Sequence, residues 1–222
     1  MIFDLYAEEY DAWYDRHRDL YLSELEVVKL AKCRGGVELG VGTGRFAKPL
    51  GLYAGLDPSA AMLKLAPREL DLVQGVGEAA PFRDGAYPCA LVVATLCFVK
   101  DPAGLLREAA RVAKRVAVCI VPRDSPWGRR YRELAAAGHR FYSAAKFYTV
   151  AEVVQMLKDV GVDAAEIYAT LSSPPTEAAY EPPAQVTAAE AERYGFVCVA
   201  GDVYKRRSLA TYVSGGGVKK PK

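Results

Sequence analysis

Three glycines and one acid stand together in the stretch VELGVGTGRF, which covers residues 37–46. Gly40, Gly42 and Gly44 follow an apolar run that predicts a strand, and the residues after them predict a helix. Glycine lets the backbone approach a ligand closely, and the amides at the start of a helix favour an anionic or polar group. The stretch therefore predicts a ligand site with the acid Glu38 beside it.

The spacing of the glycines limits the choice of ligand. A phosphate-binding P-loop is excluded because no Gly-Lys-Ser or Gly-Lys-Thr follows the turn. A dinucleotide fingerprint fits only in the frame from Gly42 to Ala47, and that frame places the next strand-end acid, Asp57, fifteen residues beyond Gly42. The dinucleotide pattern expects about twenty residues at this point. Neither phosphate site fits the turn well.

Apolar runs alternate with helical patterns from residue 36 onward, which favours an α/β fold with a mostly parallel sheet flanked by helices. Strands are predicted at 36–39, 53–57, 71–76, 90–95, 115–121, 164–171 and 196–204, and helices at 45–50, 59–66, 104–113 and 150–160. Two further helices are predicted within 4–33, and a proline-rich surface loop at 172–185. We expect a single domain over 1–205, with a helical lid at 1–33 and a core at 34–205, followed by a flexible basic tail at 206–222.

The charge balance is nearly even, with 29 basic and 27 acidic residues and a net charge of +2, so composition does not demand a nucleic acid partner. The first residues lack a signal-peptide pattern and no run reaches membrane-spanning length, so we expect a cytoplasmic protein with no membrane partner. The lack of asparagine is typical of a thermophilic source. Five cysteines without C-x-x-C spacing predict no metal site, and the sequence leaves open whether any of them form a disulfide.

Four ordered segments carry a resemblance to a known family. Glu38-Leu39-Gly40-Val41-Gly42-Thr43-Gly44 matches the first motif of the class I S-adenosylmethionine-dependent methyltransferases, and GLDPSAAML, GVGEAAPFRDGAY and LVVATLCFVKDP are similar to later segments of that family. The opening FDLYAEEYDAWYD resembles the N-terminal lid of its small-molecule and quinone C-methyltransferase subfamily, also called methyltransferase type 11. The resemblance implies a Rossmann-like sheet of seven strands in the order 3-2-1-4-5-7-6, with strand 7 antiparallel, and S-adenosyl-L-methionine as cofactor.

The resemblance also implies roles for particular residues. Glu38 would balance the ammonium of the cofactor, directly or through water, and Asp57 would accept hydrogen bonds from both ribose hydroxyls. The alternative for Asp57 is a helix N-cap. Residues 75–78 read Gly-Val-Gly-Glu where the family has Gly-Asp-Ala-Glu, so Glu78 or the backbone of Gly77 would replace the carboxylate near the adenine. The predicted cofactor-binding set is Tyr10, Glu38, Gly40, Gly42, Thr43, Gly44, Asp57, Pro58, Met62, Gly77, Glu78, Thr95 and Leu96.

The methyl acceptor is expected at the end of the fourth strand, beneath the N-terminal tyrosines and the segment 121–143. His139 is the candidate general base because its reference pKa is near neutrality, and Tyr10 and Tyr14 are candidates to cover the sulfonium. The alternatives are a helix-end or surface histidine and an aromatic stripe that only packs the core. The predicted function is methylation of a small molecule, and the alternatives are methylation of RNA or protein, suggested by YKRR and KKPK, or a non-catalytic cofactor-binding module. The acceptor atom, pathway and oligomeric state stay open.

Overall fold

The computed structural model describes residues 2–204. The strands form one eight-stranded sheet in the order β3-β2-β1-β4-β5-β8-β6-β7. The pairs from β3 through β5 are parallel, whereas β8 is antiparallel to both β5 and β6. The strands are β1 (Val37–Leu39), β2 (Ala54–Asp57), β3 (Asp71–Gln74), β4 (Ala90–Val93), β5 (Arg115–Ile120), β6 (Glu166–Thr170), β7 (Ala184–Gln185) and β8 (Phe196–Asp202).

This topology confirms the predicted Rossmann-like fold, because β8 is the antiparallel strand inserted between β5 and β6. The structure adds the short edge strand β7, which lies in the segment predicted as a proline-rich loop and pairs with β6. The helices are α1 (Ile2–Leu5), α2 (Ala7–Arg16), α3 (Arg18–Leu30), α4 (Ala47–Leu50), α5 (Ala60–Leu65), α6 (Pro102–Val112), α7 (Pro126–Ala136), α8 (Val150–Asp159) and α9 (Ala188–Ala191). The predicted basic tail lies outside the described residues.

Helix starts are fixed by local capping. Asp101 accepts a hydrogen bond from the amide of Gly104 at the start of α6, and Thr149 forms a capping box with Glu152 at the start of α8. Ser125 caps α7 in the same way, with proline in the first turn. The sequence analysis predicted no helix in this segment, so α7 is an addition to the expected elements.

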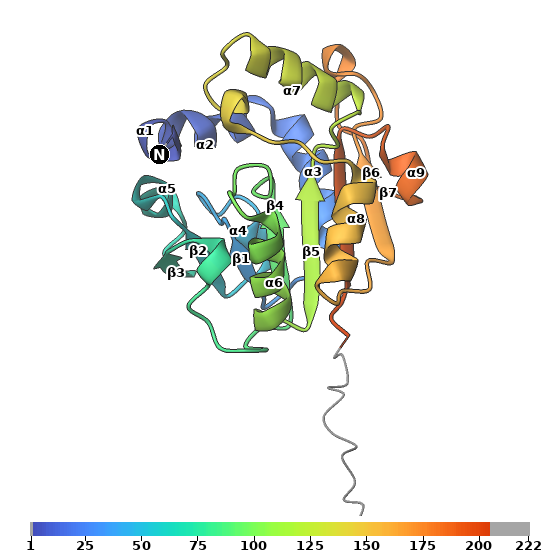
Figure 1. Cartoon of the computed structure of the whole chain (residues 1–222). Helices are drawn as coiled ribbons and strands as arrows, with labels where there is room; N and C mark the ends of the chain where they lie inside the picture. The colour runs from blue at the N-terminus through green and yellow to red at the C-terminus, as the bar shows by residue number, and fades with distance from the viewer. Residues whose placement is uncertain (1, 205–222) are drawn as a thin grey trace, which may run out of the picture.

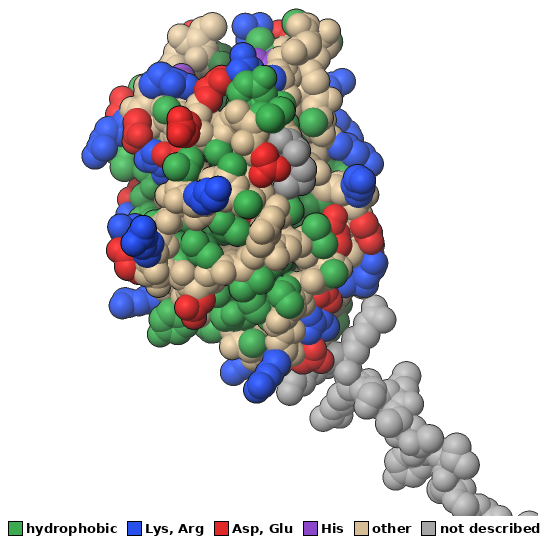
Figure 2. Space-filling model, turned by 90° about the vertical axis from the view of Figure 1, so that its left-hand side faces the viewer, with side chains coloured by type: hydrophobic (Ala, Val, Ile, Leu, Met, Phe, Trp, Pro, Cys, Tyr) green, Lys and Arg blue, Asp and Glu red, His purple; other side chains and the backbone are tan. Residues whose placement is uncertain are grey.

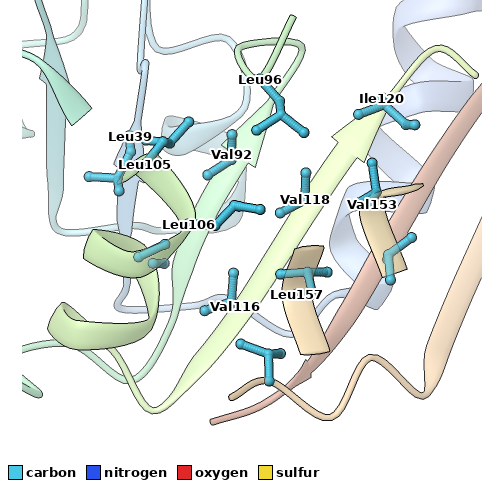
Figure 3. Packing of buried hydrophobic residues seen from close by; sticks show 14 of the residues in the cluster. Leu39, Val92, Leu96, Leu105, Leu106, Val116, Val118, Ile120, Val153 and Leu157 are labelled. Carbon is cyan, nitrogen blue, oxygen red and sulfur yellow. The ribbon is translucent and has the colours of Figure 1, made fainter. Parts of the chain in front are cut away.

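Two hydrophobic clusters lie on opposite faces of the sheet. On the face toward the viewer in Figure 1, α6 and α8 cover the sheet, and Leu105 and Leu106 of α6 are fully buried. Figure 3 shows Val92 and Val118 from the strands pointing toward these helices. On the other face, α3 packs its buried residues Val27 and Val28 against the sheet. Both faces of the central strands are therefore buried, as a parallel sheet requires.

The helices α1, α2 and α7 lie at the edge of the sheet toward which β5 points (Figure 1). This is the carboxyl edge of the parallel strands, where ligands bind in open α/β sheets. The sequence analysis predicted two helices before the first strand, whereas the structure has three, because the chain leaves helical geometry at Tyr6 and again at His17. Within residues 2–204, no helix is both long and apolar enough to cross a lipid bilayer.

Two buried disulfides link parts of the chain that are distant in sequence. Cys119 and Cys198 face each other across β5 and β8, and they are bonded over a separation of 79 residues. Cys33, which follows α3, is bonded to Cys89 beside β4 over a separation of 56 residues. All four cysteines belong to the hydrophobic cluster on the face of the sheet that α3 covers. The sequence had left open whether any of the cysteines form disulfides.

Candidate active site

The glycine turn after β1 depends on close approach and left-handed backbone. Gly40 has φ of +84°, and a Cβ atom there would lie 2.3 Å from side-chain atoms of Thr95. Gly44 has φ of +77°, and a Cβ atom there would lie 2.7 Å from Pro67. Larger residues are therefore excluded at both positions by strain and by contact. Gly40 faces the end of β4, whereas Gly44 packs against the segment after α5.

Asp57 ends β2 and holds the glycine turn in place. Its carboxylate accepts hydrogen bonds from the amide of Gly42 at 2.9 Å and from the amide of Ser59 at 2.8 Å. The N-cap of α5 is Ser59, whose hydroxyl oxygen accepts from the amide of Met62 at 3.2 Å. Burial raises the pKa of Asp57, and the two backbone hydrogen bonds oppose that rise. A helix N-cap was the alternative role for Asp57, but the N-cap of α5 is Ser59.

Glu38 lies in the centre of β1 and is only 2% exposed. Burial raises its pKa well above the usual glutamate value, and the nearby charge of Asp57 raises it further, while a hydrogen bond from the amide of Ala47 acts in the opposite direction. Its Oε2 atom has no hydrogen-bond partner anywhere in residues 2–204. An unpartnered carboxylate oxygen beside a glycine turn is a ready acceptor for a charged donor.

A cavity of about 370 Å³ opens over the glycine turn. It extends from the end of β1, past Asp57, to the short helix Gly77–Ala79 and the end of β4. Of the predicted cofactor-binding residues, Gly44 and Leu96 do not line this cavity, and Thr43 lines it while its hydroxyl donates to Asp11 at 2.6 Å. The predicted residues that line it are Tyr10, Glu38, Gly40, Gly42, Thr43, Asp57, Pro58, Met62, Gly77, Glu78 and Thr95. We call this space the glycine-turn cavity.

A second cavity of about 270 Å³ lies beside the first and has mainly aromatic walls. Leu96 and His139 line it, together with residues from α2, α3 and α7. Six side chains line both cavities and form the wall between them: Tyr10, Tyr14, Phe46, Val93, Ala94 and Phe98. Ala94 has a φ of +48°, which is rare for a residue other than glycine and marks strain at this wall. We call the second space the aromatic cavity.

The helices α1 and α2 are fastened over both cavities. Arg45, in the turn, donates to Asp11 from Nε at 2.7 Å and from Nη2 at 2.6 Å, and its Nη1 donates to Asp15 at 2.8 Å. The hydroxyl of Ser59 donates to Asp4 of α1 at 2.6 Å. On the far side, Arg140 pairs with Glu9 at 2.7 Å. These contacts tie the N-terminal helices to the glycine turn, to the start of α5 and to the segment after α7.

The predicted acceptor residues meet in the aromatic cavity. The hydroxyls of Tyr10 and Tyr14 lie 3.2 Å apart, and burial raises the pKa of both phenols. The ring of His139 stacks on Tyr142 with centroids 4.4 Å apart, and its Nδ1 has no partner in the part of the chain that the structure describes. Arg129 and Arg130 of α7 line neither cavity, so the structure does not bring them to the predicted acceptor residues.

Two side chains of the aromatic cavity were missed by the sequence analysis. Burial raises the pKa of the Cys97 thiol to about 12, so this cysteine stays neutral. Glu24, in the middle of α3, also lines the cavity. Its position could have been found from the helical spacing of Leu20, Val27 and Val28, which places Glu24 on the buried face of the helix.

Comparison with known proteins extends these observations. A model of the methyltransferase domain family matches residues 37–121. An uncharacterized protein of Methanocaldococcus jannaschii is 41% identical over 165 residues, which are 72% of this chain and 80% of that protein. An uncharacterized protein of Mycobacterium tuberculosis is 40% identical over 184 residues, 79% of this chain, and the match spans 65% of its length.

Solved structures give the same family. A Thermotoga maritima S-adenosylmethionine-dependent methyltransferase, described as a possible histamine N-methyltransferase, is 35% identical, with a TM-score of 0.83 over 91% of this chain and 98% of that one. A Haloferax volcanii methyltransferase, solved with the Trm112 activator, shares the fold with a TM-score of 0.66 at 21% identity, covering 90% of this chain and 97% of that one. The chain belongs to the S-adenosylmethionine-dependent methyltransferases and uses S-adenosyl-L-methionine as its cofactor.

Proposed function

We propose that this methyltransferase acts on a small molecule that binds in the aromatic cavity. The observation that carries the proposal is that six side chains border both this cavity and the glycine-turn cavity, so the two spaces are adjacent, as direct methyl transfer from cofactor to acceptor requires. Its volume of about 270 Å³ is close to the lower end of the range for small-molecule pockets, about 300 Å³, so it suits a compact organic molecule. Its aromatic lining is also typical of such pockets.

The residues of the glycine-turn cavity fit the cofactor. Its ammonium needs a buried acceptor, and the free Oε2 of Glu38 offers one. Its ribose diol needs a pair of acceptors, and each oxygen of Asp57 accepts only one backbone hydrogen bond in the structure, which leaves a further lone pair on each. Val76, Gly77 and Glu78 line the end of the cavity where we place the adenine. The assignment of these residues as the binding set is part of the proposal.

When bound, the cofactor supplies an electrophilic methyl carbon, whose bond to sulfur breaks with the electron pair remaining on sulfur while a bond forms to the acceptor. The protein has to exclude water, orient the acceptor and remove a proton where the acceptor carries one. Helices α1 and α2 cover the cavities together with Phe141, whose ring contacts Phe3, Tyr6 and Tyr10. We assign His139, which lines the aromatic cavity, to take this proton, and Tyr10 and Tyr14, which line both cavities, to face the sulfonium.

The face of the molecule shown in Figure 2 gives no support to a nucleic acid substrate. On the face shown in Figure 2, basic and acidic side chains are interspersed among apolar ones, and neither sign gathers into one patch. The basic KKPK segment that suggested RNA or protein methylation lies outside the described residues. The Thermotoga maritima relative is described as a possible histamine N-methyltransferase, and such an activity would agree with a small-molecule substrate. The cytoplasmic location and the thermophilic source stay predictions.

Methyl-labelled cofactor provides the test. The protein is incubated with a metabolite extract, with RNA and with protein from the same cells, and the label is traced by product size. We expect label in small molecules, and we expect Cys97→Phe, which fills the aromatic cavity only, to abolish transfer while S-adenosylhomocysteine still binds. Tyr53→Phe, at an exposed position, is the control. Label in RNA or protein would contradict the proposal, and cofactor binding without any labelled product would favour a non-catalytic module.

A further inference from the structure

Glu24 is the acid of the aromatic cavity that the proposed function has not used. Its side chain forms no hydrogen bond or ion pair within residues 2–204, and burial alone raises its pKa to about 8. The side chain nevertheless keeps some accessible surface, and it lines the aromatic cavity. A carboxyl group that keeps accessible surface, yet has its pKa raised by burial, contacts solvent inside a cavity rather than at the outer surface of the protein.

Aromatic side chains surround this carboxyl group. Burial is the main reason that the pKa values of four tyrosines lie above the usual value, and a negative charge on Glu24 adds to each rise, so all four are close to it: Tyr10, Tyr14, Tyr131 and Tyr142. Tyr21, on the same helix, is affected in the same direction. The other ionisable side chains that line the cavity are Glu9, Arg16, Cys97, His139 and Tyr148.

The cavity therefore attracts cations. Arg16 is exposed and is the one arginine or lysine among the residues that line it, so an acidic ligand would find no buried counter-charge. The faces of aromatic rings attract an ammonium group, and a buried carboxylate without a partner is stabilised by one. A ligand that carries a basic nitrogen satisfies both features at once.

We propose that Glu24 binds the protonated amine of the methyl acceptor and accepts the proton that must leave nitrogen before it can be methylated. This inference rests on the proposed function, because it assumes that the aromatic cavity is the acceptor site. The acceptor class is an aliphatic or arylalkyl amine. Glu24 is an acceptor-binding residue in this account and replaces His139 as the group that takes the proton, while the ring of His139 stacks on Tyr142 at the cavity wall.

The proton count closes without another reactant. An ammonium ligand pairs with the ionised carboxylate, one N–H bond breaks, and the proton passes to a carboxylate oxygen of Glu24. The nitrogen keeps the electron pair and is then a neutral nucleophile, and the carboxyl group is neutral. A carboxyl group with a pKa near 8 is a far better base for an ammonium ion than an ordinary glutamate is. The proton leaves to water when the lid opens.

Binding to the full chain saturated with S-adenosylhomocysteine tests the inference without turnover. The probes are phenethylamine and benzylamine, with 2-phenylethanol and benzyl alcohol as neutral partners of the same shape, and affinity is measured by titration calorimetry. We expect the amines to bind at least about tenfold more tightly than the alcohols. Glu24→Gln should remove this preference and leave the affinity for S-adenosylhomocysteine unchanged. Glu26→Gln is the matched control, because Glu26 lies on the same helix and pairs with Lys29 at 2.6 Å outside the cavity.

The pH dependence separates charge recognition from a purely structural role. Free Glu24 is largely protonated at neutral pH, so binding an ammonium ion as an ion pair releases a proton. Amine affinity should therefore rise by up to about tenfold per pH unit from about pH 6 to about pH 8, and the rise should vanish in Glu24→Gln. Tyr10, Tyr14, Tyr131 and Tyr142 titrate above this range because burial raises their pKa values.

The outcomes separate this inference from the proposed function. Equal affinity for amines and alcohols, failure of both amines to bind, or an amine preference that survives in Glu24→Gln would overturn the role of Glu24. Methylation of neutral or acidic small molecules would also overturn it, while the proposed function would stand. Label confined to RNA or protein would instead overturn the proposed function itself.

Discussion

Arg45 donates two parallel hydrogen bonds to the carboxylate of Asp11, from Nε at 2.7 Å and from Nη2 at 2.6 Å. Arg45 belongs to the segment that follows the glycine turn, and Asp11 belongs to α2, so this pair joins the covering helix to the turn beneath it. Burial would raise the pKa of Asp11, but the hydrogen bonds from Arg45 and Thr43 lower it overall. A planar guanidinium holds a carboxylate in this two-point geometry, and an ammonium does not.

Arg45→Lys should therefore loosen α2. We expect affinity for S-adenosylhomocysteine to fall about fivefold, or roughly 1 kcal/mol, and amide hydrogen exchange in α2 to become faster. Asp15→Asn, at a position outside both cavities, should shift both measurements in the same direction but less. Arg107→Lys, which changes an exposed pair with Asp101, serves as the control. Unaltered amide hydrogen exchange in α2 would show that the pair of Arg45 and Asp11 does not hold the helix.

Substitution of Asp57 should mainly weaken cofactor binding, whereas substitution of Ser59 should mainly lower the free energy of unfolding. Asp57→Ser loses the paired carboxylate oxygens, so affinity for S-adenosylhomocysteine should fall by at least about tenfold, roughly 1.4 kcal/mol. Ser59→Ala loses the cap of α5, so the free energy of unfolding should fall by about 1 kcal/mol, with a smaller effect on affinity. Calorimetric titration and urea unfolding measure the two quantities. The reverse pattern would remove Asp57 from the cofactor site.

Glu38 should make the ligand-free protein less stable as pH rises. Because burial raises its pKa, the folded state holds the proton more tightly than the unfolded chain does. The resulting stabilisation is complete below the usual glutamate pKa and is lost as pH rises through the raised folded value. Glu38→Gln should remove most of this dependence while weakening cofactor binding. Melting temperatures between about pH 5 and about pH 8 measure the effect, and a mutant with the same pH profile as the native protein would contradict it.

The disulfides should contribute strongly to stability. In a chain-entropy model, closing loops of 56 and 79 residues stabilises the folded state by about 4 kcal/mol for each bond. Reduction should therefore lower the melting temperature, and the pairwise replacements Cys33→Ala with Cys89→Ala, and Cys119→Ala with Cys198→Ala, should each reproduce part of that loss. Cys97→Ala controls for loss of a thiol alone. Equal melting with and without reductant would exclude this contribution.

Strands such as β4 and β5 were predictable because each is a buried apolar run bounded by residues that end a strand. The predicted run 90–95 differs from β4 by two residues, since Ala94 turns into left-handed backbone where the pattern still reads as apolar. The helix α7 was missed because arginines dominate its sequence and only Trp127 and Gly128 are buried in it. The break at His17 carries no glycine or proline, so three N-terminal helices read as two.

The glycine turn and Asp57 could be placed from sequence because local spacing determines them. Helical spacing could assign Glu24 to the buried face of α3 but not to the aromatic cavity, because its neighbours there come from α2, α7 and the segment around Tyr142, which are far from it in the chain. The disulfide pairing is also a property of tertiary structure, since Cys119 meets Cys198 only when β8 inserts beside β5. Local patterns therefore indicate the fold and the glycine-turn cavity, whereas the aromatic cavity depends on long-range packing.

The wall that the two cavities share has a kinetic consequence. Tyr10 and Tyr14 of α2 border both spaces, so under the proposed function a movement of this one helix would uncover the cofactor and the acceptor together. If both products leave past α2, the rate at which this helix opens would limit turnover. An enzyme built in this way is expected to show a burst of product in the first cycle, followed by a slower steady rate that follows solvent viscosity rather than the reactivity of the acceptor.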